Sequence, residues 1–275
     1  MTNQTFNFNR YALTLRKELV ENKKQLLIIV LCLFLGLSFL MFIGNWVFEH
    51  SNISIHQIRS VAIVTVMGTF GTVISIMASL MFNGLKDKPE RVSHLMSPAT
   101  TLEKFLVQVT IYFVGGILAF FFCAQLADLV RIGLMNLFSG SLILPPINFV
   151  TGIFNIKEWG FPLSLGEMGV VITPWVMVVS FVFSFTFYML GAVLWPKLSF
   201  LKTFAASYVL QMFLGIAFLA FLAVGDLEDV VLYMKNSFPQ FFVVMAVIYA
   251  VLIVVTVVAA YWLYKRKDVV KNSWL

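Results

Sequence analysis

Six long apolar runs constrain the fold of this chain more than any other feature of its sequence. Each run has about the 20 residues that an α-helix needs to cross the hydrocarbon core of a bilayer. Lipid offers the backbone no hydrogen-bond partners, so we expect each run to be helical throughout. The predicted spans are Leu26–Phe48, Ile58–Phe82, Phe105–Val130, Gly169–Trp195, Phe204–Val224 and Phe241–Tyr264.

The composition agrees with an all-α membrane protein. Of 275 residues, 60% are hydrophobic and 12% are charged, whereas about 25% of the residues in a soluble domain are charged. The first apolar run is longer than the core of a signal peptide, so we expect it to remain as a span. We predict a single transmembrane domain over residues 1–275, with the six-span bundle at 26–264. Cys32 and Cys123 lie in apolar runs, and we expect free, buried thiols.

Basic residues set the predicted orientation. Most of the 19 Lys and Arg residues fall in four segments on one side of the membrane: residues 1–24, 84–104, 196–203 and 265–275. The exceptions are Arg59, Arg131, Lys157 and Lys235. The positive-inside rule therefore places both termini, including the basic tail 265–275, in the cytoplasm. The formal charge of +6 then reflects topology and anionic lipid, and no nucleic-acid partner is needed to explain it.

The segment 1–25 is predicted to form an amphipathic helix before the first span. Its apolar residues recur at spacings of three and four: Phe8, Tyr11, Ala12, Leu15 and Leu19. Charged and polar residues fill the other face. This pattern favours a helix lying in the membrane interface, and a solvated cytoplasmic helix is the alternative.

The loop Asn83–Lys104 holds two signals for helix starts. Asp87 to Glu90 includes an early proline before a short helical stretch, and Ser97-Pro98 then breaks it. Thr100 and Glu103 have the spacing of a capping box, which would begin the third span. We expect a short cytoplasmic helix between spans two and three, with a plain connecting loop as the alternative. On the outer side we expect a long loop at Met135–Met168 and a short one at Asp226–Gln240.

The sequence lacks the patterns of an enzyme or a metal site. The three histidines, His50, His56 and His94, are divided between two sides of the predicted membrane. No His-Glu-x-x-His, Cys-x-x-Cys or Gly-x-Ser-x-Gly motif occurs. The nearest approach to a nucleotide-binding loop, at Gly84-Leu85-Lys86, lacks the glycines that cradle phosphates. We therefore expect no catalytic residue, no metal and no cofactor in this chain.

Small polar residues form stripes on two predicted spans. The second span carries Thr65, Gly68, Thr72, Ser75, Ser79 and Asn83 at spacings of three and four. The fifth carries Thr203, Ser207, Gln211 and Gly215 at spacing four. Such stripes allow helices to pack closely. The alternative is that they line a substrate route, since polar groups that are costly in lipid tend to face an interior.

Asp128 and Arg131 lie three residues apart near the outer end of the third span, and Gln125 comes one turn earlier. Opposite charges at this spacing can neutralise each other on one helix. A proton relay would need further ionisable partners within the spans. The sequence therefore favours a structural ion pair over a relay.

Several local patterns suggest a family. The passage Leu95-Met96-Ser97-Pro98-Ala99-Thr100-Thr101-Leu102-Glu103 resembles the segment that leads from the coupling helix into the third span of type-2 ABC exporter permeases. The stretch Arg10-Tyr11 followed by Arg16-Lys17-Glu18-Leu19 resembles the helix before the first span in that family. This chain departs from the family in two ways. It has Val107-Gln108 where the family often has Gly-Lys. Its longer outer loop is predicted between the third and fourth spans, whereas in the family it usually lies between the fifth and sixth.

The resemblance implies an export permease of the bacterial cytoplasmic (inner) membrane. Two permeases would pair, as a homodimer or with a related chain, and separate ATPase subunits would bind ATP and magnesium. The coupling helix would include Pro89, Glu90, Arg91, Val92, His94, Leu95 and Met96. The substrate route would include Thr65, Gly68, Thr72, Ser75, Ser79, Ser207 and Gln211. The alternatives are a non-transporting scaffold or accessory subunit and, less favoured, an ion-coupled carrier, for which no span holds a central charge.

Overall fold

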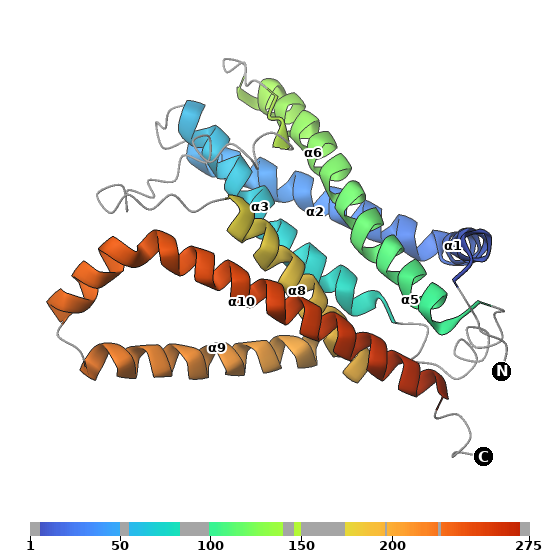
Figure 1. Cartoon of the computed structure of the whole chain (residues 1–275). Helices are drawn as coiled ribbons and strands as arrows, with labels where there is room; N and C mark the ends of the chain where they lie inside the picture. The colour runs from blue at the N-terminus through green and yellow to red at the C-terminus, as the bar shows by residue number, and fades with distance from the viewer. Residues whose placement is uncertain are drawn as a thin grey trace. The chain divides into compact units, whose positions relative to one another are not determined.

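The computed structural model describes residues 6–49, 55–82, 99–139, 146–149, 174–195, 197–224 and 227–269. The regular structure within these ranges is entirely helical, as the apolar runs predict (Figure 1). The helices are α1 (Phe8–Glu21), α2 (Lys23–Glu49), α3 (Ile55–Leu80), α5 (Thr101–Val109), the π-helix η2 (Thr110–Gly115), α6 (Gly116–Ser139), α8 (Pro174–Leu194), α9 (Ser199–Val224) and α10 (Leu227–Val269).

Five stretches in the described part are long and apolar enough to cross a bilayer, as expected of a multi-pass membrane protein. They are Lys23–Gly44, Ala62–Leu80, Thr101–Leu137, Met177–Leu194 and Val244–Arg266. Each overlaps a predicted span. The remaining predicted span, Phe204–Val224, lies in helix α9 but is not among these five, so a sixth span stays a prediction.

Two predicted outer loops overlap helices of the structure. The third span continues as a helix to Ser139, so the outer loop does not begin at Met135. Asp128 and Arg131, which lie near the predicted outer end of this span, are both buried. The predicted short outer loop 226–240 is helical from Leu227 onward, despite the proline at position 239. Figure 1 shows a bend in the N-terminal part of α10, and a proline within a helix removes a backbone hydrogen bond and commonly bends it.

The chain divides into two compact units. One comprises Met1–Ile74 and Val109–Leu163, and the other comprises Ser75–Gln108 and Ser164–Leu275. Two of the boundaries fall inside helices: one within α3 and one at the end of α5. Each unit thus includes segments that are distant in sequence.

The first unit has its core between α2 and α6. Every fourth residue on one side of α2 is buried: Leu33, Leu37 and Met41. Phe120 of α6 is fully buried, and its ring lies 4.9 Å from that of Phe70. This spacing is typical of tilted aromatic pairs in a well-packed core.

The second unit is built around α8, which packs along α10 and against α9. Phe183 of α8 stacks on Tyr249 of α10 with a centroid separation of 5.2 Å. At the C-terminal end of α10, the ring of Tyr264 lies 5.2 Å from Phe82 and 5.8 Å from Phe105. These aromatic contacts connect α10 to the end of α3 and the start of α5.

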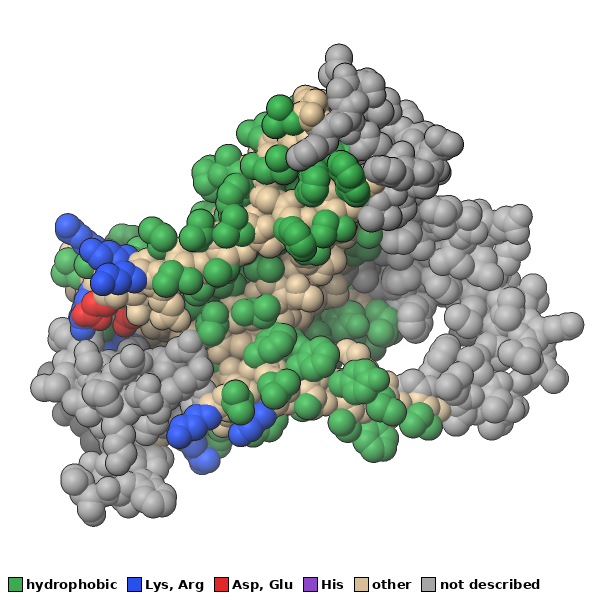
Figure 2. Space-filling view, turned by 180° about the vertical axis from the view of Figure 1, so that it is seen from behind, with side chains coloured by type: hydrophobic (Ala, Val, Ile, Leu, Met, Phe, Trp, Pro, Cys, Tyr) green, Lys and Arg blue, Asp and Glu red, His purple; other side chains and the backbone are tan. Residues whose placement is uncertain are grey.

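Much of the exposed surface is apolar. On the face shown in Figure 2, apolar side chains cover the described helices and the charged side chains lie in small groups. Side chains such as Leu118 (67%) and Phe122 (64%) on α6 are largely exposed, as a lipid-facing surface requires. Both cysteines are free, and Cys123 is buried. The expectation of burial was wrong for Cys32, which is exposed on the outward side of α2.

Candidate functional site

The predicted coupling segment stays a prediction. Its residues Pro89, Glu90, Arg91, Val92, His94, Leu95 and Met96 lie outside the described residues. The description of the chain resumes at Ala99, immediately before α5.

The start of α5 is held by the predicted capping box, which is confirmed. The backbone N–H of Thr100 donates to Oε2 of Glu103 at 2.8 Å, and the N–H of Glu103 donates to Oγ1 of Thr100 at 3.2 Å. These reciprocal bonds satisfy two donors that a helix start otherwise leaves free. Glu103 is fully buried, whereas such caps usually lie in water. The direction in which the chain enters α5 is therefore fixed by buried polar contacts.

Lys104 is also buried, with 4% of its side chain exposed. The sequence places this residue at the end of the predicted cytoplasmic segment 84–104. Gln108, one turn later, is buried as well. The apolar residues around these positions gave no signal that the first turns of α5 carry polar side chains into the interior.

The polar stripe on α3 has a packed half within the second unit. Oγ of Ser75 lies 3.0 Å from Oγ of Ser184 on α8. Oγ of Ser199 donates to the carbonyl of Ser79 at 2.8 Å, and both serines of α3 are buried. These two members of the predicted route therefore take part in close helix packing.

The other half of the α3 stripe belongs to the first unit and is more open. Thr65 is half-buried, and Gly68 and Thr72 are exposed. A Cβ placed on Gly68 would meet no atom within 4 Å in the described part of the chain. The Thr72 hydroxyl donates to the carbonyl of Thr69 at 2.8 Å. Packing against the described part of the chain therefore does not explain why small residues occur here.

The stripe on α9 divides in the same way. Thr203 is buried against Gly191 of α8, where a Cβ on the glycine would come within 2.8 Å of the threonine Cβ. Ser207 is half-buried and donates to the carbonyl of Phe204 at 2.8 Å. Gln211 is exposed, and its amide makes no hydrogen bond to any described residue. The sequence predicted that these residues share one face of α9, but it did not show which of them are buried and which are exposed.

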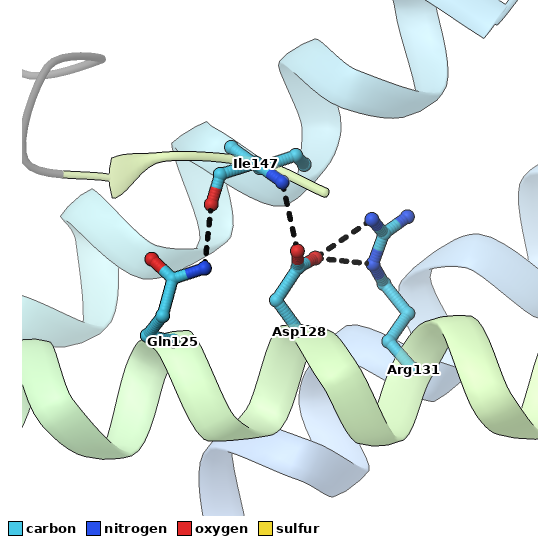
Figure 3. Close-up of polar contacts among 4 residues, drawn as sticks. All are labelled: Gln125, Asp128, Arg131 and Ile147. Carbon is cyan, nitrogen blue, oxygen red and sulfur yellow. Dashed lines mark hydrogen bonds and ion pairs between the residues drawn. The ribbon is translucent and has the colours of Figure 1, made fainter. Parts of the chain in front are cut away.

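Asp128 and Arg131 form a buried ion pair in the first unit (Figure 3). The Asp128 Oδ1 atom accepts from Nε of Arg131 at 2.8 Å and lies 2.7 Å from Nη2. Its second oxygen, Oδ2, accepts from the backbone N–H of Ile147 at 2.8 Å. Gln125 donates through Nε2 to the carbonyl of the same residue at 3.1 Å. Two side chains of α6 thus hold both backbone groups of Ile147.

The sequence predicted the spacing of this pair but missed its contact with Ile147. Side-chain bonds to a distant backbone leave no periodic signature. The arrangement resembles a structural clamp more than a proton pathway, because its hydrogen bonds end on backbone groups that do not titrate.

Helix α1 is joined to the third span by a hydroxyl pair. Asn7 caps the helix by accepting from the N–H of Asn9 at 2.9 Å. The hydroxyl of Tyr11 lies 2.7 Å from Oγ1 of Thr110, the first residue of η2. Thr14 is buried, whereas Phe8 (70%) and Leu13 (68%) are largely exposed. The side of α1 that faces the protein is therefore distinct from its most exposed apolar residues.

No group of His, Cys, Asp and Glu side chains that could hold a metal ion occurs in the described ranges. Comparison with protein-family models, with curated proteins and with solved structures finds no match to this chain.

Proposed function

We propose that this chain is the transmembrane permease subunit of an ATP-driven, ABC-type exporter in a bacterial inner membrane. A separate ATPase would bind ATP and magnesium, and a second permease, identical or related, would complete the pathway. In this proposal α9 is the sixth membrane span, and both termini are cytoplasmic. The support is the chain's several apolar helices, the distribution of basic residues and the resemblance of residues 95–103 to the coupling region.

The exposed amide of Gln211 carries the proposal of a substrate route. The hydroxyls of Thr72 and Ser207 bond to carbonyls of their own helices, so both residues could face lipid at little cost. An amide carries two N–H donors and one acceptor, and these groups lack partners in hydrocarbon. The Gln211 side of α9 is therefore better suited to a water-filled route or a polar partner than to lipid.

The buried cap at Thr100 and Glu103 supports the coupling part of the proposal. The residues proposed to contact the ATPase end at Met96, and the cap begins α5 only four residues later. A joint fixed by two hydrogen bonds transmits a displacement better than a solvated, fraying helix start. Glu103 is thus proposed as a positioning residue for the third span.

A scaffold or accessory subunit is the second candidate. The observation that favours it is the packing of Ser75, Ser79 and Thr203, because three stripe residues have structural contacts. A scaffold requires no aqueous route along the open ends of the stripes.

Cysteine labelling separates the two candidates without knowledge of the substrate. In a background where Cys32 and Cys123 are replaced by serine, Thr72→Cys and Gln211→Cys should react with a small, water-soluble thiol reagent. Leu210→Cys on α9 and Ile76→Cys on α3 are the matched controls, since both positions are exposed and apolar. Equal, negligible labelling of all four variants would contradict the route.

The coupling role is tested by purification from native membranes and identification of the proteins that copurify. An ATPase should accompany the wild-type chain, and Leu95→Ala should reduce its recovery strongly. Glu90→Ala should do less, because truncating a buried anchor typically costs about 2 kcal/mol or more and removing a rim charge less than about 1. ATP turnover in reconstituted vesicles is the second measurement. If replacing all of 89–96 by polar residues leaves recovery and turnover unchanged, the scaffold is the better explanation.

A further inference from the structure

Two buried polar atoms in the first unit have no hydrogen-bond partner among the described residues: Nη2 of Arg131 and Oγ of Ser38. Nη2 lies 2.7 Å from Asp128 Oδ1 in the ion pair, but only Nε makes a hydrogen bond to that oxygen. The second carboxylate oxygen, Oδ2, accepts from the Ile147 N–H. A buried donor or acceptor without a partner is costly, which makes each of these atoms a position where a ligand would be stabilising.

The register of α2 and α6 places the two residues at the same level along the helices. Sγ of Cys123 contacts the carbonyl of Val30 at 3.7 Å, across a sequence separation of 93. Phe42 packs against Met135 with the same separation. Ser38 and Arg131 also differ by 93, and each lies eight residues after the first pair and four before the second. Equal separations mean that the two helices run parallel with a constant offset, so Ser38 and Arg131 lie level at their interface.

We propose that Ser38 and Arg131 together bind one buried water molecule between α2 and α6. A water molecule can accept from Nη2–H of Arg131 and donate to, or accept from, the Ser38 hydroxyl. Buried waters typically bridge polar groups that the protein leaves unsatisfied. The site is independent of the proposed transport function.

The charge of the site selects water over other ligands. The Asp128 carboxylate already neutralises the Arg131 guanidinium, so a bound anion would leave an uncompensated negative charge in the interior. An apolar ligand would leave both polar atoms unsatisfied. A small neutral molecule that both donates and accepts hydrogen bonds meets all of these requirements.

The site is tested by whether removing the Ser38 hydroxyl lowers or raises the Tm. Ser38→Ala in the full-length protein in detergent should lower the Tm by about 2–4 °C, because the water loses one of its partners. If the hydroxyl has no partner, its removal should leave the Tm unchanged or raise it, and the proposal is then wrong. Ser180→Ala is the matched control. Its hydroxyl donates to the carbonyl of Met177 on the same helix at 2.8 Å, so its Tm should change little.

Repeating the Ser38→Ala measurement in an Arg131→Lys variant shows whether Arg131 binds the same water molecule. Arg131→Lys retains a positive charge beside Asp128 but removes Nη2. The Tm loss from Ser38→Ala should therefore shrink in this background, whereas an equal loss in both backgrounds would overturn the shared site. An experimental structure that resolves ordered water should show a density peak within hydrogen-bond distance of both atoms. A direct contact between Oγ and Nη2, with no such peak, would also refute the proposal.

Discussion

The two units bury polar groups in different ways. In the first, a charged pair and one amide of α6 gather around the backbone of a single residue, Ile147. In the second, hydroxyls bridge neighbouring helices, Ser75 to Ser184 at 3.0 Å and Thr256 to Thr186 at 3.0 Å. Two charged residues, Glu103 and Lys104, are also buried there, at the start of α5. The Thr256 hydroxyl also bonds to carbonyls of its own helix. The hydrogen bonds of Asp128 and Gln125 thus converge on one residue in the first unit, whereas the hydroxyl bridges of the second unit join separate pairs of helices.

The largest effect is expected at the charged pair. Asp128→Asn or Arg131→Gln alone should each lower stability by about 3–5 kcal/mol, since each leaves an unpaired charge in the interior. The double variant should be more stable than either single variant, because it buries no charge. Unfolding of the purified protein in detergent, monitored for all four proteins, measures the coupling.

If the stability losses of the two single variants simply add up in the double variant, the two charges do not stabilise each other. It would also remove the contrast between the units, because the first unit would then contain only independent polar contacts.

The next effect concerns close packing in the second unit. Gly191→Ala should destabilise the protein by about 1–3 kcal/mol, since the added methyl meets Thr203. Thr203→Ala in the same protein should recover part of the loss by removing the atoms in the way. Gly133→Ala on α6 is a control, because a Cβ there meets no described atom within 4 Å. Comparable losses at both glycines would show that the α8–α9 contact is not the cause.

A smaller loss is expected at the cap of α5. Glu103→Ala should cost about 1 kcal/mol, because the Thr100 N–H loses its acceptor. Glu103→Gln should retain most of the stability, since an amide oxygen can accept the same bond. Thermal unfolding of the two variants measures this difference. If glutamine proves as damaging as alanine, the carboxylate charge matters more than the hydrogen bond.

The smallest effect is expected for a single hydroxyl of the second unit. Thr256→Val keeps the side-chain shape and removes the bond to Thr186, so it should cost only about 0.6 kcal/mol. The same change at Thr186 should give a similar value, and the double variant should cost little more than either one. A loss of several kcal/mol at Thr256 would show that the hydroxyls act as a connected network and that the contrast between the units is wrong.

The sequence predicted the helices of this fold well and their ends less well. Long apolar runs identify α2, α3 and α10 because lipid exposure requires apolar side chains over the whole length of a span. The sequence did not predict the helical start of α10 at Leu227, because residues 227–240 are polar enough to resemble a loop. The π-helix η2 also had no signal, since one additional residue in a turn leaves the apolar pattern nearly unchanged.

The candidate sites show a similar limit. The spacing of Thr100 and Glu103 predicted their reciprocal bonds, because a capping box depends only on nearby residues. The stripe residues Ser79 and Gln211 look alike in sequence, but the first is buried and the second is exposed. That difference depends on which helices meet, and a single helix's periodicity does not contain this information.

The placement of both charges on α6 has a consequence for membrane insertion. A charged residue at the centre of a span adds about 2.5–3.5 kcal/mol to the free energy of insertion. Asp128 and Arg131 are three residues apart on the same helix, so they can neutralise each other as soon as that helix forms. Ile147 is synthesised 19 residues after Asp128 and joins later. The third span can therefore leave the insertion machinery as a neutral segment, whatever the order in which the other spans arrive.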